Sequence, residues 1–133
     1  MTTVIFACIH NAGRSQMAAA FFNKYADPNK AKAISAGTQP ADQVHLRVKM
    51  ATTEVDIDLS AAKPTKLTTE LASGASYLIT MGCKENCPYI ANVTMMDWPF
   101  EDPNGKELDQ VRVTRDMIKA KVLNFLAEKI WLT

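Results

Sequence analysis

The start of the chain places a short apolar strand directly before an amphipathic helix. Residues 3–7 form a β-branched and aromatic run, which is typical of a buried strand. A loop follows, and from Ser15 apolar residues recur at helical spacing until Asp27-Pro28 ends the helix. A strand that leads into a helix predicts a right-handed crossover to a parallel neighbour, so the chain is constrained to an α/β fold.

The same alternation continues through the rest of the sequence. The further expected elements are strands at 33–36, 76–81 and 92–98, and helices over 44–55, 68–72 and 108–130. The last helix carries its apolar residues on one face and most of its charges, Arg115 among them, off that face. No repeat, linker or low-complexity tract interrupts the pattern, and 133 residues suffice for one core. We therefore predict a single domain over residues 1–133.

Composition limits the partners and the compartment. A net charge of +1 argues against a broad nucleic-acid or membrane surface, because either would need a basic excess. The apolar run before Cys8 is too short for a signal or a membrane span, so we expect a cytoplasmic protein. Three cysteines, Cys8, Cys83 and Cys87, are an odd number and fit poorly with paired extracellular disulfides. We expect no nucleic-acid or membrane partner, and a monomer.

The loop between the first strand and the first helix has the composition of an oxyanion site. Such a turn points consecutive N–H groups at one spot, and the helix N-terminus adds partial positive charge. Arg14 supplies a planar pair of donors, Gly13 lets the backbone turn closely, and Asn11 is expected to brace the loop. The same surroundings favour the thiolate of Cys8, with the Ser15 hydroxyl placed to hydrogen-bond to it, so Cys8 is the expected nucleophile. The predicted oxyanion-binding residues are Ile9, His10, Asn11, Ala12, Gly13, Arg14 and Ser15.

Residues 8–15 resemble the Cys-x5-Arg-Ser loop of the low-molecular-weight tyrosine phosphatases and of the arsenate reductases that share their fold. Three further motifs recur in that family at the same relative places, and the resemblance covers essentially the whole chain. They are Gln16-Met17-Ala18, Ser35-Ala36-Gly37-Thr38 and Asp102-Pro103. The resemblance implies a three-layer α/β/α fold with a four-stranded parallel sheet in the order 2-1-3-4 and helices on both faces.

An acidic loop precedes the last helix and contains Asp97, Glu101 and Asp102. Transfer of an oxyanion to a thiol needs a proton for the departing oxygen, which a carboxylic acid can give. The sequence alone leaves all three acids open, with a solvated acidic turn as the alternative, and the family resemblance selects Asp102. The phosphatases usually carry an aromatic residue after this Asp-Pro pair, whereas here Asn104-Gly105 follows, which disfavours phosphotyrosine as the substrate.

Cys83 and Cys87 follow the third expected strand, and the resemblance gives them a redox role. In the order 2-1-3-4, the strands that end at Cys8 and Cys83 are neighbours about 4.8 Å apart, so Cys83 can approach an adduct on Cys8. The resemblance to arsenate reductases implies a relay in which Cys8 attacks arsenate, Cys83 attacks Cys8, and Cys87 takes over the disulfide. Burial in the core is one alternative. Zinc binding is another, but two thiols with only His10 and His45 make a poor ligand set, and no metal is expected.

The resemblance thus implies a thioredoxin-coupled arsenate reductase that acts in arsenic detoxification, binds no cofactor and needs an external thiol reductant. A low-molecular-weight thiol with a glutaredoxin-like partner is the second choice for the reductant. Phosphate and sulfate are expected competitors of arsenate. One alternative is a phosphatase that hydrolyses a phosphocysteine intermediate, with Cys83 and Cys87 as bystanders. Another is a non-catalytic phosphate-binding or carrier module.

Overall fold

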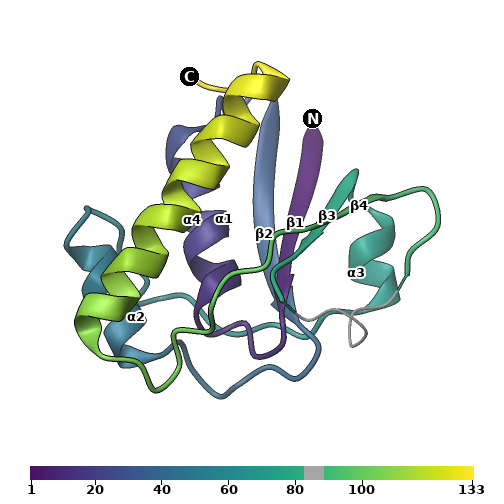
Figure 1. Ribbon diagram of the computed structural model, residues 1–133. Coiled ribbons are helices and arrows are strands. Elements are labelled where there is room, and N and C mark those ends of the chain that lie inside the picture. The colour runs from purple at the N-terminus through teal and green to yellow at the C-terminus, as the bar shows by residue number, and fades with distance from the viewer. Residues whose placement is uncertain (83–88) are drawn as a thin grey trace.

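The computed structural model describes residues 1–82 and 89–133, so the predicted redox residues Cys83 and Cys87 lie outside the described residues. Four parallel strands form one sheet in the order β2-β1-β3-β4, which confirms the predicted fold (Figure 1). The strands are β1 (Thr2–Cys8), β2 (Ala31–Gly37), β3 (Tyr77–Thr80) and β4 (Thr94–Asp97). The helices are α1 (Arg14–Tyr25), α2 (Leu46–Thr53), α3 (Thr69–Ser73) and α4 (Leu108–Lys129).

Helices cover both faces of the sheet. Figure 1 shows α1, α2 and α4 on one side and α3 on the other. Successive residues of β1 face opposite sides, because side chains alternate along a strand. Val4 and Phe6 therefore join the core under α1 and α4, whereas Ile5 and Ala7 join the smaller core beside α3. Burial on both faces explains why β1 is apolar from Val4 to Cys8.

Element boundaries differ from the predicted ones where local hydrogen bonds intervene. Helix α2 begins at Leu46 rather than 44, because the N–H of His45 binds Ala12 O outside the helix. It ends at Thr53 rather than 55, and Asp56 soon afterwards adopts a left-handed backbone with a φ of 63°. None of the helices in the described part of the chain is both long and apolar enough to cross a membrane.

The expected position of Arg115 off the apolar face of the last helix was wrong. Arg115 is 8% exposed, and its Nη1 donates to Ala51 O and to the Glu54 carboxylate, each at 2.9 Å. Both acceptors lie at the C-terminal end of α2, so this side chain ties α2 to α4. The helical pattern counts an arginine as a surface residue, but a long side chain can pass along a helix interface to reach such acceptors.

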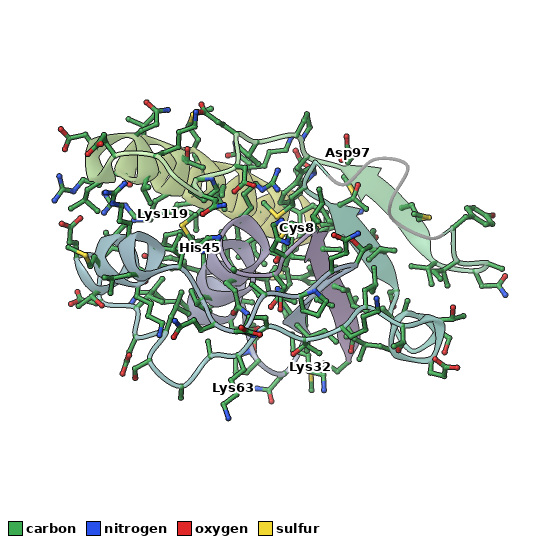
Figure 2. The ribbon with its side chains drawn as sticks, turned by 90° about the horizontal axis from the view of Figure 1, so that it is seen from below. Cys8, Lys32, His45, Lys63, Asp97 and Lys119 are labelled. Atoms are coloured by element: carbon green, nitrogen blue, oxygen red, sulfur yellow. The ribbon has the colours of Figure 1, made fainter. Side chains whose placement is uncertain are left out.

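Because all strands are parallel, their C-terminal ends lie at one edge of the sheet, the lower edge in Figure 1. Figure 2 views the protein from this side and shows Cys8 near the middle of the edge and Asp97 at the end of β4. In parallel α/β sheets, ligands bind outside this edge. The fold thus brings the end of β1, which carries Cys8, beside the ends of its neighbours β2 and β3.

Candidate active site

Cys8 is the last residue of β1, and its thiol is built into a buried polar network. Cys8 is 2% exposed, and its Sγ lies 2.9 Å from Ser15 Oγ. Asn11 Nδ2 donates to the same Oγ at 2.7 Å, and the Ser15 hydroxyl still has its own proton to share with Cys8. The orientation of the Asn11 amide is fixed from its other end, because Thr65 N donates to Oδ1 at 2.9 Å. Asn11 is fully buried and has a left-handed backbone with a φ of 50°.

The loop from Cys8 to Gly13 turns its main-chain carbonyls away from its centre. Five of these carbonyls accept hydrogen bonds from main-chain N–H groups of later residues. The pairs, donor first, are Thr38 with Cys8, Gln39 with Ile9, Ala41 with His10, His45 with Ala12 and Met17 with Gly13, at N···O distances of 2.8–3.3 Å. Within residues 1–82 and 89–133, no main-chain N–H from Ile9 to Ser15 donates a hydrogen bond. These N–H groups and the N-terminus of α1 together make a concavity suited to an anion.

The Arg14 guanidinium lies against three different segments. It is 6% exposed, and its Nη1 donates to Phe100 O at 3.1 Å. Its Nη2 lies 3.8 Å from Asp102 Oδ2. At Gly82, whose φ is 97°, an added Cβ would stand only 2.5 Å from Nη1. Gly82 is therefore required for its left-handed backbone and also for the space that Arg14 occupies.

Of the three acids in the loop before α4, Asp102 is the one that contacts Arg14. Its side chain is 46% exposed, and its Oδ1 accepts a hydrogen bond from Asn104 N at 2.9 Å. Asp97 instead accepts from Thr80 Oγ1 at 2.8 Å, and Glu101 pairs with Lys106 at 3.0 Å. The structure thus brings Asp102 to the Cys8 loop and engages the other two acids elsewhere.

Gly13 joins the Cys8 loop to the acidic loop. A Cβ at this position would lie 2.8 Å from Pro103 Cγ, so the missing side chain makes room for the ring of Pro103. A close turn within the loop was the predicted reason for a glycine here, whereas the structure gives a close approach between two loops. Asp102 is the residue before this proline, and its position depends on the same contact.

Two histidines flank the loop. The ring of His10 lies with Nδ1 at 3.0 Å from Gln39 O. His45 precedes α2 and lines a cavity of about 390 Å³ whose opposite wall is formed by residues 103–105. Burial lowers the pKa of His45, and the nearby Asp102 carboxylate partly opposes this shift. A neutral imidazole therefore faces the acidic loop at neutral pH.

The sequence profile of the low molecular weight phosphotyrosine protein phosphatases matches residues 3–130. The chain belongs to this family. A putative arsenate reductase from Halobacterium salinarum is 35% identical over 127 residues, which cover 92% of this chain and 89% of that protein. The resemblance drawn from the Cys8 loop is therefore confirmed at the level of the family.

Solved structures of family members share this fold. One, an arsenate reductase in the phosphate binding state, superposes with a TM-score of 0.84 at 31% identity and covers 96% of this chain and 98% of its own. A thioredoxin-dependent arsenate reductase from Corynebacterium glutamicum has a TM-score of 0.81 at 30% identity. The match covers 96% of this chain but 61% of that longer one.

Three contacts of the site were missed by sequence reasoning. Gly82 and Phe100 touch the Arg14 guanidinium, and Thr65 fixes the Asn11 amide. Phe100 and Thr65 act through main-chain atoms, which any residue type supplies, so the sequence carries no signal for them. Gly82 does leave a signal, since a glycine at a strand end often marks a left-handed residue or a close approach.

Proposed function

We propose that this protein is an arsenate reductase in which Cys8 is the nucleophile. The observation that carries the proposal is the arrangement around Cys8. Its Sγ lies 2.9 Å from the Ser15 hydroxyl, beside the buried Arg14 and the main-chain N–H groups of the loop, which donate to no acceptor within residues 1–82 and 89–133. The similarity to arsenate reductases supports arsenate as the anion that binds there.

In the first step, the Cys8 thiolate attacks arsenic and one As–O bond breaks. The departing oxygen needs a proton, and we assign its donation to Asp102, a choice supported by the 3.8 Å contact of Asp102 with Arg14. The loop N–H groups and the Arg14 guanidinium stabilise the negative charge on the remaining oxygens during this exchange. Asp102 is 46% exposed, so it can regain its proton from solvent.

In the second step, the thiolate of Cys83 attacks Cys8 Sγ. An S–S bond forms, the S–As bond breaks, and its electron pair leaves with arsenic as arsenite. Cys87 then attacks Cys83, which frees Cys8 and leaves a Cys83–Cys87 disulfide for the external reductant. Gly82, which lies against Arg14, directly precedes Cys83 in the sequence, and this supports the assignment of Cys83 to the second step.

We propose thioredoxin as the reductant, supported by the similarity to the thioredoxin-dependent enzyme of Corynebacterium glutamicum. A low-molecular-weight thiol with a glutaredoxin-like protein is the second candidate. All electrons of the relay come from thiols, so the reaction needs no bound cofactor and no metal. We propose that the protein acts as a monomer, with phosphate and sulfate as competing anions.

The test couples arsenate turnover to thioredoxin and its reductase and measures aryl phosphate hydrolysis in parallel. Cys8→Ser should abolish both activities, whereas Cys83→Ser should abolish arsenate reduction and spare any hydrolysis. A parallel assay with glutathione and glutaredoxin identifies the reductant. Arsenate turnover at the native rate by both Cys83→Ser and Cys87→Ser would show that the relay is wrong.

A phosphatase is the second candidate function, because the family profile is that of phosphotyrosine protein phosphatases. The loop N–H groups, Arg14 and Asp102 would serve a phosphocysteine intermediate equally well, since phosphate and arsenate share shape and charge. In that case water would attack the adduct, and the two downstream cysteines would have no part. Hydrolysis that is faster than arsenate reduction, and indifferent to Cys83→Ser, would favour this function.

A further inference from the structure

The sixth carbonyl of the loop, that of Asn11, is held by a side chain. Gln16 Nε2 donates to Asn11 O at 3.0 Å, and it also lies 3.2 Å from Asn11 Oδ1 and 3.3 Å from Lys63 O. Gln16 is 6% exposed and lies in the first turn of α1, directly after Ser15. The other five carbonyls from Cys8 to Gly13 are held by main-chain N–H groups, which remain when a side chain is replaced.

The direction of the Asn11 carbonyl decides the direction of the next N–H group. A trans peptide is planar, and its C=O and N–H point to opposite sides. Because Gln16 draws Asn11 O outward, the N–H of Ala12 turns toward the centre of the loop. Ala12 is fully buried and lies between Asn11, whose backbone is left-handed, and Gly13. Asparagine tolerates left-handed backbone better than other residues with a Cβ, and the hydrogen bond from Gln16 fixes the orientation of the peptide that follows it.

We propose that Gln16 is a positioning residue of the oxyanion site. Its side-chain amide holds the Asn11–Ala12 peptide so that the Ala12 N–H faces the bound oxyanion. The same amide contacts Asn11 Oδ1, and it therefore also supports the side chain that donates to Ser15. This inference rests on the proposed binding of an oxyanion at the Cys8 loop and extends the site by a residue outside the Cys-x5-Arg-Ser segment.

The alternative role for Gln16 is purely structural, as a link between α1 and the segment around Lys63. Asn23 offers a matched control for a structural link of this kind. Asn23 lies on the same helix, and its amide makes two hydrogen bonds to the main chain of Ala33, at 2.9 and 2.8 Å. It is a comparable tie between α1 and a neighbouring segment that does not involve the Cys8 loop. Loss of this tie should destabilise the protein without changing the oxyanion site.

The test uses inorganic phosphate as the probe and the full chain. The Kd is measured from protection of Cys8 against iodoacetamide, with the modified peptide identified by mass. Gln16→Met, which keeps the length but cannot donate, should raise the Kd about tenfold, which corresponds to about 1.4 kcal/mol. Gln16→Glu should raise it at least as much, because a carboxylate repels the carbonyl oxygens. The Kd of Asn23→Ala should stay within about twofold of the Kd of the native protein, since this substitution removes no hydrogen bond to the bound oxyanion.

Amide NMR spectra supply a second readout. In the native protein the Ala12 resonance should move on addition of phosphate, and in Gln16→Met this response should be lost while that of Arg14 remains. Three results would overturn this inference alone. They are a native Kd for phosphate in a folded Gln16 variant, an equal loss of phosphate affinity in Asn23→Ala, and an Ala12 resonance of the native protein that does not move when phosphate binds. Failure of the native protein to bind phosphate at all would overturn the proposed function with it.

Discussion

Replacement of Gly82 by alanine should disturb the site through Arg14 and not through Cys8. The added Cβ would lie 2.5 Å from Arg14 Nη1 and 3.6 Å from its Cζ. Side-chain carbons do not approach so closely, so the guanidinium has to move. Its hydrogen bond from Nη1 to Phe100 O, 3.1 Å long, would then break. Gly82 also has a φ of 97°, which the new side chain would strain.

These two effects have separate magnitudes. A left-handed backbone costs a residue with a Cβ about 1–2 kcal/mol, so the free energy of unfolding should fall by about this amount. A displaced guanidinium loses its hydrogen bonds to the oxyanion, and a bond to a charged group is worth about 1.5–3 kcal/mol. Since 1.4 kcal/mol is a factor of ten, the Kd for phosphate should rise about ten- to a hundredfold.

Urea unfolding measures the first effect, and phosphate protection of Cys8 measures the second. Gly105→Ala is the matched control, because Gly105 has a φ of 75° and no atom of the described residues beyond its chain neighbours lies within 4 Å of an added Cβ. We expect both variants to lose stability and only Gly82→Ala to lose affinity for phosphate. Native affinity in Gly82→Ala would refute the view that the close contact between Gly82 and Arg14 places the guanidinium.

Three further changes test other contacts. Gly13→Ala should push Pro103 away, because the added Cβ would lie 2.8 Å from the Cγ of Pro103. The rate of arsenate turnover should then fall more than the affinity for phosphate. An equal fall in both would contradict a selective effect on the acidic loop. Hydrogen bonds from Arg112 lower the pKa of Glu54 from its ordinary 4.5 to about 2. The Glu54 carboxylate therefore stabilises the fold fully above pH 4.5, and this stabilisation is lost as the pH falls toward about 2. Glu54→Gln should accordingly lower the thermal midpoint at neutral pH and change it little near pH 2, and an equal change at both would argue against the ion pair. Ile130→Gly should raise the free energy of unfolding, measured with urea, by about 1 kcal/mol. Ile130 has a left-handed backbone with a φ of 60° at the end of α4, and its side chain is 76% exposed, so little packing is lost with it. No increase would mean that contacts of Ile130 offset the backbone strain.

The sheet could be predicted from the sequence because short β-branched or apolar runs, clearest in β1 and β3, are separated by segments with helical spacing. The alternation with helices predicted parallel strands, and the family resemblance supplied their order. The exact ends of the strands were harder to predict from the sequence. Strand β4 was expected over 92–98 but pairs only over Thr94–Asp97, because it is an edge strand with β3 as its single partner. The strand-like composition of 92–98 extends beyond the paired residues, and the sequence records composition but not pairing.

The site could be predicted where its parts are contiguous in the sequence. Residues 8–15 form one turn, so their chemistry is visible as a motif. Phe100 and Thr65 were out of reach because each contributes a main-chain atom from a distant segment. Arg115 was misjudged for a related reason, since its buried position depends on a carbonyl of another helix. Sequence patterns report side-chain types well and main-chain acceptors not at all.

Arg14 connects the two halves of the proposed reaction. Its guanidinium touches Phe100 and Asp102, which belong to the loop of the proton donor, and Gly82, which ends the segment before Cys83. These segments meet because β1, β3 and β4 are successive neighbours in the sheet. The hydrogen bond to Phe100 O uses one of the five N–H donors of the guanidinium, so the same side chain can hold the acidic loop while its other donors serve an oxyanion.

This arrangement explains why the Cys8 loop cannot by itself distinguish a reductase from a phosphatase. In the proposed reaction the loop N–H groups, Arg14 and Asp102 serve formation of the adduct on Cys8, which is the same step for arsenate and phosphate. The outcome depends on whether a thiolate or a water molecule next attacks that adduct. In the thiolate case the bond to Cys8 Sγ breaks with both electrons on arsenic, and in the hydrolytic case the thiol is regenerated. Substitution of Cys83 removes only the attack by a thiolate. A comparison of arsenate reduction with phosphate ester hydrolysis in that variant therefore separates the two functions, which a measurement of anion binding cannot do.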